Sequence, residues 1–379
     1  MSTIKEFVLN RNEEILEVYN ALHAIPEVSA QEYKTSEFIK EYLETHGFEV
    51  TSGIADTGVA AYINSGAEGP VLAVRADIDA LEHLIDGEIV MKHSCGHDAN
   101  TAMAIFSAIA AKEAGLVKKG SLKMIFQPSE EREETSGARA MVEAGVIDDV
   151  DMLIGIHLRP QNELRMGQAI AGMRHSALNT ILAEIKGEGT HGGRPHQGKN
   201  PIDAIAAIIN AVNAIWVDPA ISWSIKLTSI HADGGNNCTV PAAGRIGLDL
   251  RSNSNEIMEE LIENAKAAIT AGAATVGCEA EIEVIPGLPA GIIDDGMAKI
   301  AAEAISEVLG AEGCMGIRDT LGGDDFTVYP YTKRELKATF LGLGADLAPG
   351  LHHPDMDFNK DALANGVRII SGMIQKILG

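Results

Sequence analysis

Apolar positions along the chain recur with two spacings, one typical of amphipathic helices and the other of strands. Near the beginning, residues 13–24 and 29–46 carry the helical spacing, and the second helix is expected to begin at a Ser29 cap and to stop at Gly47. Short apolar runs then alternate with helical stretches. Strands are expected over 59–63, 71–75, 122–126 and 152–156, and helices over 99–114 and 138–144. This alternation predicts an α/β domain.

The pattern changes at about residue 174 and changes back near Pro286 and Pro289. The intervening segment is expected to hold strands over 178–185, 223–230, 245–251 and 279–285, and helices over 201–215 and 256–271. A helix over 297–309, a strand over 338–341 and a helix over 360–378 then follow. We therefore expect a mixed-sheet α/β/α domain, residues 1–173 and 288–379, with an inserted, smaller α+β (ferredoxin-like) domain, residues 174–287.

The amino-acid composition and net charge indicate which class of protein to expect and which partners are excluded. The 379 residues are 46% hydrophobic and 22% charged, and no uninterrupted apolar run approaches the roughly 18 residues of a membrane span, so a soluble globular protein is expected. A net charge of -24 would repel phosphate backbones and anionic lipids, which argues against nucleic acid and membrane as partners. The first 20 residues are polar and lack the order of a signal peptide, and the four cysteines show no disulfide spacing. A cytoplasmic location is expected.

Chemically active side chains follow the ends of several expected strands, which is where open α/β sheets place their ligands. Asp77 and Asp79 follow 71–75, the pair Glu130 and Glu131 follows 122–126, and His157 follows 152–156. Two further groups, Cys95 and His97, lie two residues apart at an expected helix start, where the helix dipole favours a thiolate. Asp98 beside them is a candidate helix cap.

This mixture of sulfur, nitrogen and oxygen donors predicts a metal site. Cysteine, histidine and glutamate together suit zinc and are acceptable to nickel, cobalt or manganese. Adjacent Glu130 and Glu131 allow one carboxylate to hold a metal while its neighbour accepts a proton from water, which is a hydrolytic division of labour. The neighbouring Glu133 and Glu134 are interpreted as solvated.

At these residues the sequence resembles the aminoacylase and carboxypeptidase family of co-catalytic metallohydrolases, in its N-acyl-amino-acid and auxin-conjugate amidohydrolase branch. The resemblance spans nearly the whole chain. It is carried, in the family's order, by Arg75-Ala-Asp-Ile-Asp-Ala-Leu81, His93-Ser-Cys-Gly-His-Asp98, Gln127-Pro-Ser-Glu-Glu131, Gly155-Ile-His157, Gly322-Gly-Asp-Asp-Phe326 and Leu351-His-His-Pro354. Departures occur at residues 80–83, where the family usually has Leu-Pro, and at His353, where Ser or Thr is frequent, so His352 and His353 are alternatives as a ligand and His352 is favoured.

The resemblance implies a set of roles. Two divalent transition-metal ions (Zn, Mn, Ni or Co) would be held by Cys95, His97, Glu131, His157 and His352. Glu130 would be the general base and then the proton donor to the leaving amine, and Asp79 would orient a metal-bound histidine. In the inserted domain, a dimerising lid by resemblance, His191 and Asn237 are candidate substrate contacts, and Arg251 is a candidate partner for a substrate carboxylate. The substrate would be a small N-acyl amino acid and the protein a homodimer.

Three alternatives remain open on sequence grounds. A dipeptidase or carboxypeptidase of the same family would use the same ligands. A hydrolase with Cys95 as nucleophile would leave Glu130, Glu131 and His157 without a role. A non-catalytic binding protein would keep the fold, but it would not need the base Glu130. Metal-dependent hydrolysis of an N-acyl amino acid accounts for the most residues.

Overall fold

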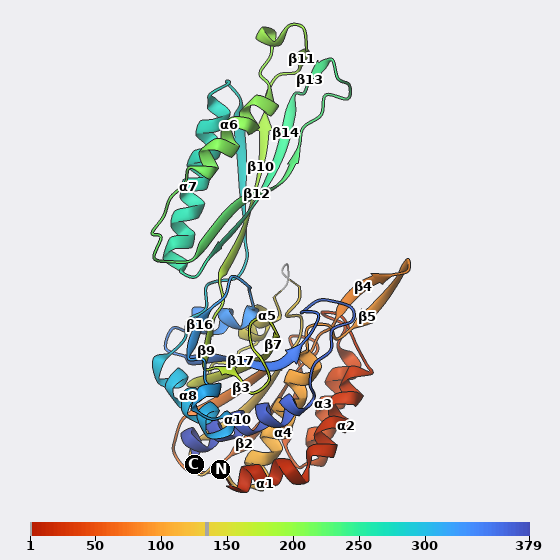
Figure 1. Ribbon diagram of the computed structural model, residues 1–379, viewed down its shortest axis with the longest axis vertical. Helices are drawn as coiled ribbons and strands as arrows, with labels where there is room; N and C mark the ends of the chain where they lie inside the picture. Colours follow the sequence, from red (N-terminus) through yellow and green to blue (C-terminus); the bar gives the residue numbers. More distant parts are fainter. Residues whose placement is uncertain (1, 133–135) are drawn as a thin grey trace. The chain divides into compact units, whose positions relative to one another are not determined.

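The computed structural model describes residues 2–132 and 136–379, which form two compact units (Figure 1). The first unit comprises Met1–Arg174, Ile292–Arg318 and Asp325–Gly379, and the second comprises His175–Gly291 and Asp319–Asp324. The contacts therefore assign residues 288–291 and 319–324 to the second unit, whereas the sequence pattern placed them in the first. Polar and glycine-rich segments such as 319–324 carry no periodic signal, so only their contacts assign them.

The first unit is built on a seven-stranded mixed sheet with the strand order β1-β2-β6-β3-β7-β17-β8. Its strands are β1 (Glu49–Ile54), β2 (Gly58–Asn64), β3 (Val71–Asp77), β6 (Ser121–Gln127), β7 (Met152–Pro160), β8 (Ala169–Ile170) and β17 (Lys337–Leu347). The four central strands β6, β3, β7 and β17 are parallel, and the outer strands pair antiparallel. The parallel strands are almost entirely buried, which explains their continuous apolar runs. The α/β expectation with a mixed sheet is confirmed.

Helices cover this sheet. They are α1 (Ser2–Asn10), α2 (Asn12–His23), α3 (Tyr33–Thr45), α4 (His97–Glu113), α5 (Gly137–Glu143), α8 (Asp295–Leu309), α9 (Val328–Thr332) and α10 (Asp361–Leu378). Short 3-10 helices of the first unit occur at Ala311–Gly313 and Asp325–Thr327, and one of the second unit at Pro195–Gln197. Every residue of α4 from His97 to Ala111 is buried, and α4 packs against α2, α10 and β3. No helix within 2–132 or 136–379 is long and apolar enough to span a membrane.

Helix α3 begins at Tyr33, so the expected start at Ser29 is wrong. The Ser29 hydroxyl donates instead to Asp79 Oδ2 (2.7 Å), far along the chain. The Glu27 carboxylate takes over at the helix start, where its Oε2 accepts the backbone N–H groups of Lys34 and Thr35, each at 2.9 Å. The serine therefore makes a tertiary hydrogen bond instead of the helix cap that its local sequence favours.

Several short elements were not expected from the sequence. Besides the edge strands β1 and β8 and the helices α1 and α9, they are β4 (Leu81–Ile85), β5 (Glu88–Lys92), β9 (Gly172–Arg174), β11 (Thr190–His191), β13 (Thr239–Val240) and β16 (Ile317–Asp319). Strands β4 and β5 form a hairpin that begins at the position where the sequence departs from the family that it resembles. These strands are short or largely exposed, so they lack the alternation that marks a strand.

The second unit carries a four-stranded antiparallel sheet with the order β12-β14-β10-β15. Its elements follow the chain order β10 (Ala177–Lys186), α6 (Pro201–Asn213), β12 (Trp223–His231), β14 (Ala243–Ser252), α7 (Asn255–Ala274) and β15 (Glu279–Pro286). Along β10 the side chains of Ile181, Ala183 and Ile185 are buried beneath α6 and α7, whereas Leu182 is exposed. This βαββαβ arrangement is ferredoxin-like.

Candidate metal centre

A tight turn leads into α4 and presents Cys95 and His97. Gly96 between them adopts a left-handed conformation (φ 90°) and is the residue that precedes the helix. The alternative that Asp98 caps α4 is therefore wrong. Asp98 accepts instead from His23 Nδ1 (2.6 Å). The side chains of Cys95 and His97 are buried at the carboxyl edge of the sheet.

A second turn, after β6, carries Glu130 and Glu131. Ser129 takes a left-handed conformation (φ 54°), and the Glu131 N–H donates to Asp79 Oδ2 (3.0 Å). One carboxylate oxygen of Glu130 and one of Glu131 each lie 3.8 Å from His97 Nε2. The carboxyl pair therefore faces the His97 imidazole. Glu133 and Glu134 lie outside the described residues.

Two histidines from elsewhere in the fold meet these groups. His157, on the carboxyl half of β7, places Nε2 3.4 Å from Cys95 Sγ, and its Nδ1 is 2.7 Å from the Leu158 carbonyl. His352 places Nε2 3.2 Å from Glu131 Oε1, and its backbone N–H is held by the Ser94 carbonyl. Both histidines are exposed, and His353 accepts from the Asp355 N–H instead. Of the two alternatives, His352 is the one that lies against Glu131.

Asp79 fixes the protonation of His97. The side chain of Asp79 is buried, and both its Oδ1 and its backbone carbonyl lie 3.0 Å from His97 Nδ1. Both oxygens only accept, so Nδ1 carries a proton that it donates. Burial lowers the pKa of His97, but Asp77, Cys95 and Asp79 raise it more, to well above its ordinary value.

The donor atoms converge in overlapping groups. In each of three such groups, all the donor atoms lie within 4.8 Å of one another, and the three groups together use six side chains. They are Cys95 with His97 and His157, Cys95 with Glu131 and His352, and His97 with Glu130 and Glu131. The buried His97 Nε2 has no hydrogen-bond partner among the described residues. Burial and the negative charge of Glu131 raise the pKa of the Cys95 thiol well above its usual range. An unpartnered buried nitrogen beside a thiol and carboxylates is the donor set of a transition-metal site.

A buried ionic network supports this edge of the sheet, and sequence reasoning missed it. Arg75 is fully buried and donates to Asp77 (2.6 Å), Asp325 (2.8 Å) and Gln127 (2.8 Å), while Tyr329 also donates to Gln127. Burial raises the pKa of Asp77, but His97 and Arg75 lower it more, so the net direction is downward. An arginine inside an otherwise apolar strand is the signal that could have indicated the network, since a buried guanidinium requires partners.

The predicted substrate contacts all belong to the second unit. His191 is exposed in β11, where its Nδ1 accepts from the Gly193 N–H (2.9 Å), and Asn237 is exposed in the loop before β13. The Arg251 guanidinium donates to Asp249 Oδ2 (2.9 Å) and to the Leu321 carbonyl (2.9 Å). The arginine is thus held by its own domain, and the substrate roles of the three residues stay predictions.

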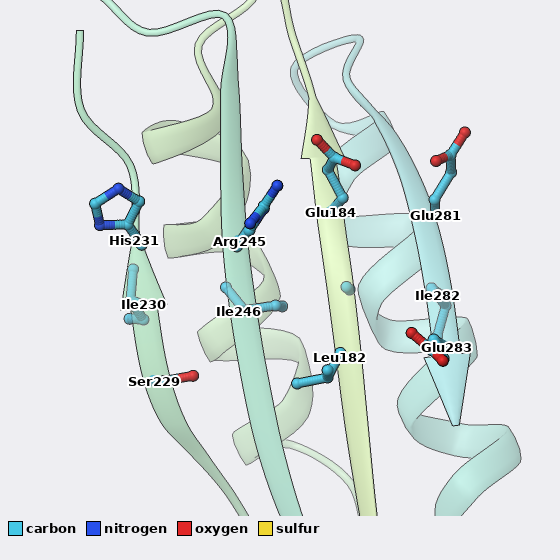
Figure 2. A pocket seen from close by; sticks show the side chains of 11 residues that line it. Leu182, Glu184, Ser229, Ile230, His231, Arg245, Ile246, Glu281, Ile282 and Glu283 are labelled. Atoms are coloured by element: carbon cyan, nitrogen blue, oxygen red, sulfur yellow. The ribbon is translucent and has the colours of Figure 1, made fainter. Parts of the chain in front are cut away.

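The second unit also has a shallow hollow of about 590 Å³ on the open face of its sheet (Figure 2). A row of cross-strand neighbours crosses it, formed by His231, Arg245, Glu184 and Glu281. Leu182 and Ile230, both exposed, lie beside this row. The hollow combines an acidic and basic row with scattered apolar side chains, which is ordinary for a solvated sheet face.

Comparisons with known proteins agree with this geometry. Residues 73–376 match the sequence profile of Peptidase family M20/M25/M40. The N-acetylcysteine deacetylase of Bacillus subtilis (strain 168) is 29% identical over 90% of this chain and 91% of its own length. The IAA-amino acid hydrolase ILR1-like 4 of Arabidopsis thaliana is 27% identical over 94% and 84%. Among solved structures, a dinuclear metal-binding peptidase of the M20 family from Bacillus subtilis has a TM-score of 0.81 at 26% identity, and the match covers 97% of this chain and 98% of that one.

Proposed function

The chain belongs to Peptidase family M20/M25/M40, and from that premise we propose that it hydrolyses the amide bond of an N-acyl amino acid with Glu130 as general base. The family relationship makes it a hydrolase of amide or peptide bonds. The finer assignment is supported by one observation above the others: within a cluster of metal donors, the Glu130 carboxylate lies 3.8 Å from His97 Nε2, for which the described residues offer no hydrogen-bond partner.

Cys95, His97, Glu131, His157 and His352 would hold two divalent transition-metal ions. The similarity to a dinuclear metal-binding peptidase and the overlapping donor groups support this number. The bound ions would polarise the acyl carbonyl and increase the acidity of water. Zinc, manganese, nickel and cobalt all suit the donor set.

Glu130 would move the protons of the reaction. Its carboxylate, about 12% exposed, can reach solvent water and accept a proton as the water attacks the acyl carbonyl. Breaking the amide bond then requires a proton on the leaving amine, and the protonated Glu130 can donate it. The Asp79 carboxylate would keep His97 in the tautomer that leaves Nε2 for a metal. Net, water adds across the C–N bond to give a carboxylic acid and an amino acid.

Two measurements on purified protein test this function. Wild type should contain about two transition-metal ions per chain by elemental analysis, and Cys95→Ala with His157→Ala should lose most of them. Glu130→Gln should keep the metal and lose about 100- to 10,000-fold in kcat on N-acetyl amino acids, while Glu143→Gln on the exposed face of α5 should match wild type. A wild type without metal, even after zinc or manganese is added, would rule out the proposed mechanism.

A cysteine hydrolase is the clearest rival, and the environment of Cys95 argues against it. A nucleophilic cysteine needs a lowered pKa, whereas burial and Glu131 raise the pKa of this thiol. Iodoacetamide should therefore inactivate the metal-loaded enzyme no faster than a Cys95→Ser variant. Rapid inactivation of the loaded wild type alone would favour the nucleophile.

A dipeptidase or carboxypeptidase is the closer rival, because it would use the same ligands. Turnover of N-acetyl amino acids compared with dipeptides separates the two activities. The substrate roles of His191, Asn237 and Arg251, a homodimer formed through the second unit and a cytoplasmic location are further parts of the proposal. Single substitutions at those three residues would test the substrate roles, and the mass of the assembly in solution would test the homodimer.

A further inference from the structure

We propose that Glu32 is a positioning residue for Glu130, acting through the backbone of Ser129. This inference rests on the proposed role of Glu130 as general base. Glu32 is fully buried, directly before α3, and is nearly 100 residues away from Glu130 in the chain. Its carboxylate is costly to bury, so the bonds that it makes should reveal its role.

Those bonds join three separate segments. Glu32 Oε1 accepts the N–H groups of Ser129 (2.8 Å) and Ala30 (3.0 Å), and Oε2 accepts from Thr57 Oγ1 (2.7 Å). Both oxygens are thus engaged by donors. The Ser129 bond is the one that reaches the turn carrying the carboxyl pair.

The Ser129 turn needs such support. Ser129 has φ 54°, a left-handed conformation that a non-glycine residue keeps only when its surroundings hold it. Its carbonyl accepts from the Gly137 N–H (3.0 Å), and a Cβ on Gly137 would lie 1.6 Å from the Pro128 carbonyl oxygen. The turn is therefore clamped on one side by Gly137 and on the other by Glu32.

Glu130 lies between two anchored neighbours. The Ser129 N–H is held by Glu32, and the Glu131 N–H is held by Asp79 Oδ2. The same irregular segment also holds Asp79, because Ser29 Oγ donates to it. Residues 29–32 therefore bind both Ser129 and Asp79, the two groups that hold the turn on either side of Glu130. Loss of the bond from Ser129 to Glu32 should let Glu130 move while Glu131 stays in place.

The chain supplies a matched control in Glu27. Its Oε2 accepts from the Lys34 N–H (2.9 Å), the Thr35 N–H (2.9 Å) and Thr35 Oγ1 (3.1 Å). Glu27 is therefore a carboxylate of the same segment that, like Glu32, accepts from two backbone N–H groups and a threonine hydroxyl, but its donors belong to α3. A merely structural role predicts similar consequences for Glu27 and Glu32, whereas a positioning role does not.

Three substitutions at Glu32 separate these possibilities. Glu32→Asp keeps the charge but withdraws the acceptor from Ser129, and Glu32→Leu removes it; kcat should fall about 10- to 100-fold with KM and metal content little changed. Glu32→Gln should stay within about threefold of wild type, since its carbonyl oxygen can accept from Ser129 while its amide donates to the Thr57 hydroxyl. Glu27→Asp should lower thermal stability without changing kcat.

The assay is steady-state turnover of an N-acetyl-L-amino-acid panel by the metal-loaded enzyme, with elemental analysis and thermal unfolding of every variant. In a Glu130→Gln background, adding Glu32→Asp should lower the residual kcat no further, because both changes act on one function. Full activity of Glu32→Asp beside an inactive Glu130→Gln would overturn the inference and leave the proposed function standing. An active Glu130→Gln, or a wild type that turns over no panel member, would overturn the proposed function and this inference with it.

Discussion

Replacing Asp79 by asparagine should weaken metal binding, because every orientation of the new amide disturbs the site. With its nitrogen in place of Oδ1, the amide would donate to His97 Nδ1, now 3.0 Å from that oxygen. Nδ1 would then face an amide donor as well as the Asp79 backbone carbonyl, which favours a shift of the His97 proton to Nε2, where it would block metal binding. With the nitrogen in place of Oδ2, the amide would face the Glu131 N–H, a second donor at 3.0 Å.

The expected magnitude follows from these two arrangements. A buried donor left without an acceptor costs about 1–3 kcal/mol, and loss of a carboxylate that orients a metal-bound histidine typically costs about 10- to 100-fold in metal affinity. At about 1.4 kcal/mol per tenfold, the second range corresponds to roughly 1.4–2.8 kcal/mol. The two ranges agree, so a loss of about 2 kcal/mol in metal-binding free energy is expected.

The assay is a zinc titration against a competing chelator, made on wild type, Asp79→Asn and Ser29→Ala. The control Ser29→Ala removes one bond to Asp79 Oδ2 but leaves the His97 tautomer unchanged, so its affinity should lie within about threefold of wild type. Wild-type zinc affinity in Asp79→Asn would refute the assignment of the His97 proton to Nδ1 by Asp79. Equal losses in both variants would point to general loosening of the turn instead.

Two further predictions concern stability. In metal-free protein the pKa of Asp77 is lowered, so its contribution to the free energy of unfolding is lost as the pH falls below about 4. The pKa of His97 is raised, so its contribution is lost as the pH rises above about 6.5. Urea unfolding should therefore show the greatest stability between these two pH values, and a stability that still rises from pH 6 to 8 would contradict this. Gly366→Ala would bring a Cβ to 1.9 Å from Met103 Sδ, so the free energy of unfolding should fall by about 1–3 kcal/mol. The control Gly350→Ala, whose Cβ would meet nothing within 4 Å, should leave the stability unchanged. Equal unfolding midpoints for the two variants would show that the contact between α4 and α10 can relax.

Local patterns were sufficient wherever an element is regular and one of its faces is buried. The strands β3 and β6 and the helix α4 appear within two residues of their expected bounds, and β7 begins where expected but extends to Pro160, because continuous apolar runs and helical periodicity reflect burial directly. Short exposed elements such as the β4 and β5 hairpin were missed because neither of their faces is buried, so their residues show no pattern of apolar positions. The start of α3 was misplaced because the hydroxyl of Ser29 bonds to Asp79 rather than to its own helix.

The amino-acid sequence was enough to identify the chemical groups that this protein can use: a cysteine, histidines and a pair of glutamates, most of them close to a strand end or a helix start. Which of these groups meet, and what holds them, depends on how the fold packs. The choice of His352 over His353, the proton on His97 Nδ1, the partners of Arg75 and the bond from Ser129 to Glu32 all join residues far apart in the chain. Periodicity reports the burial of neighbours along one element, whereas a hydrogen bond between distant segments depends on how those elements pack.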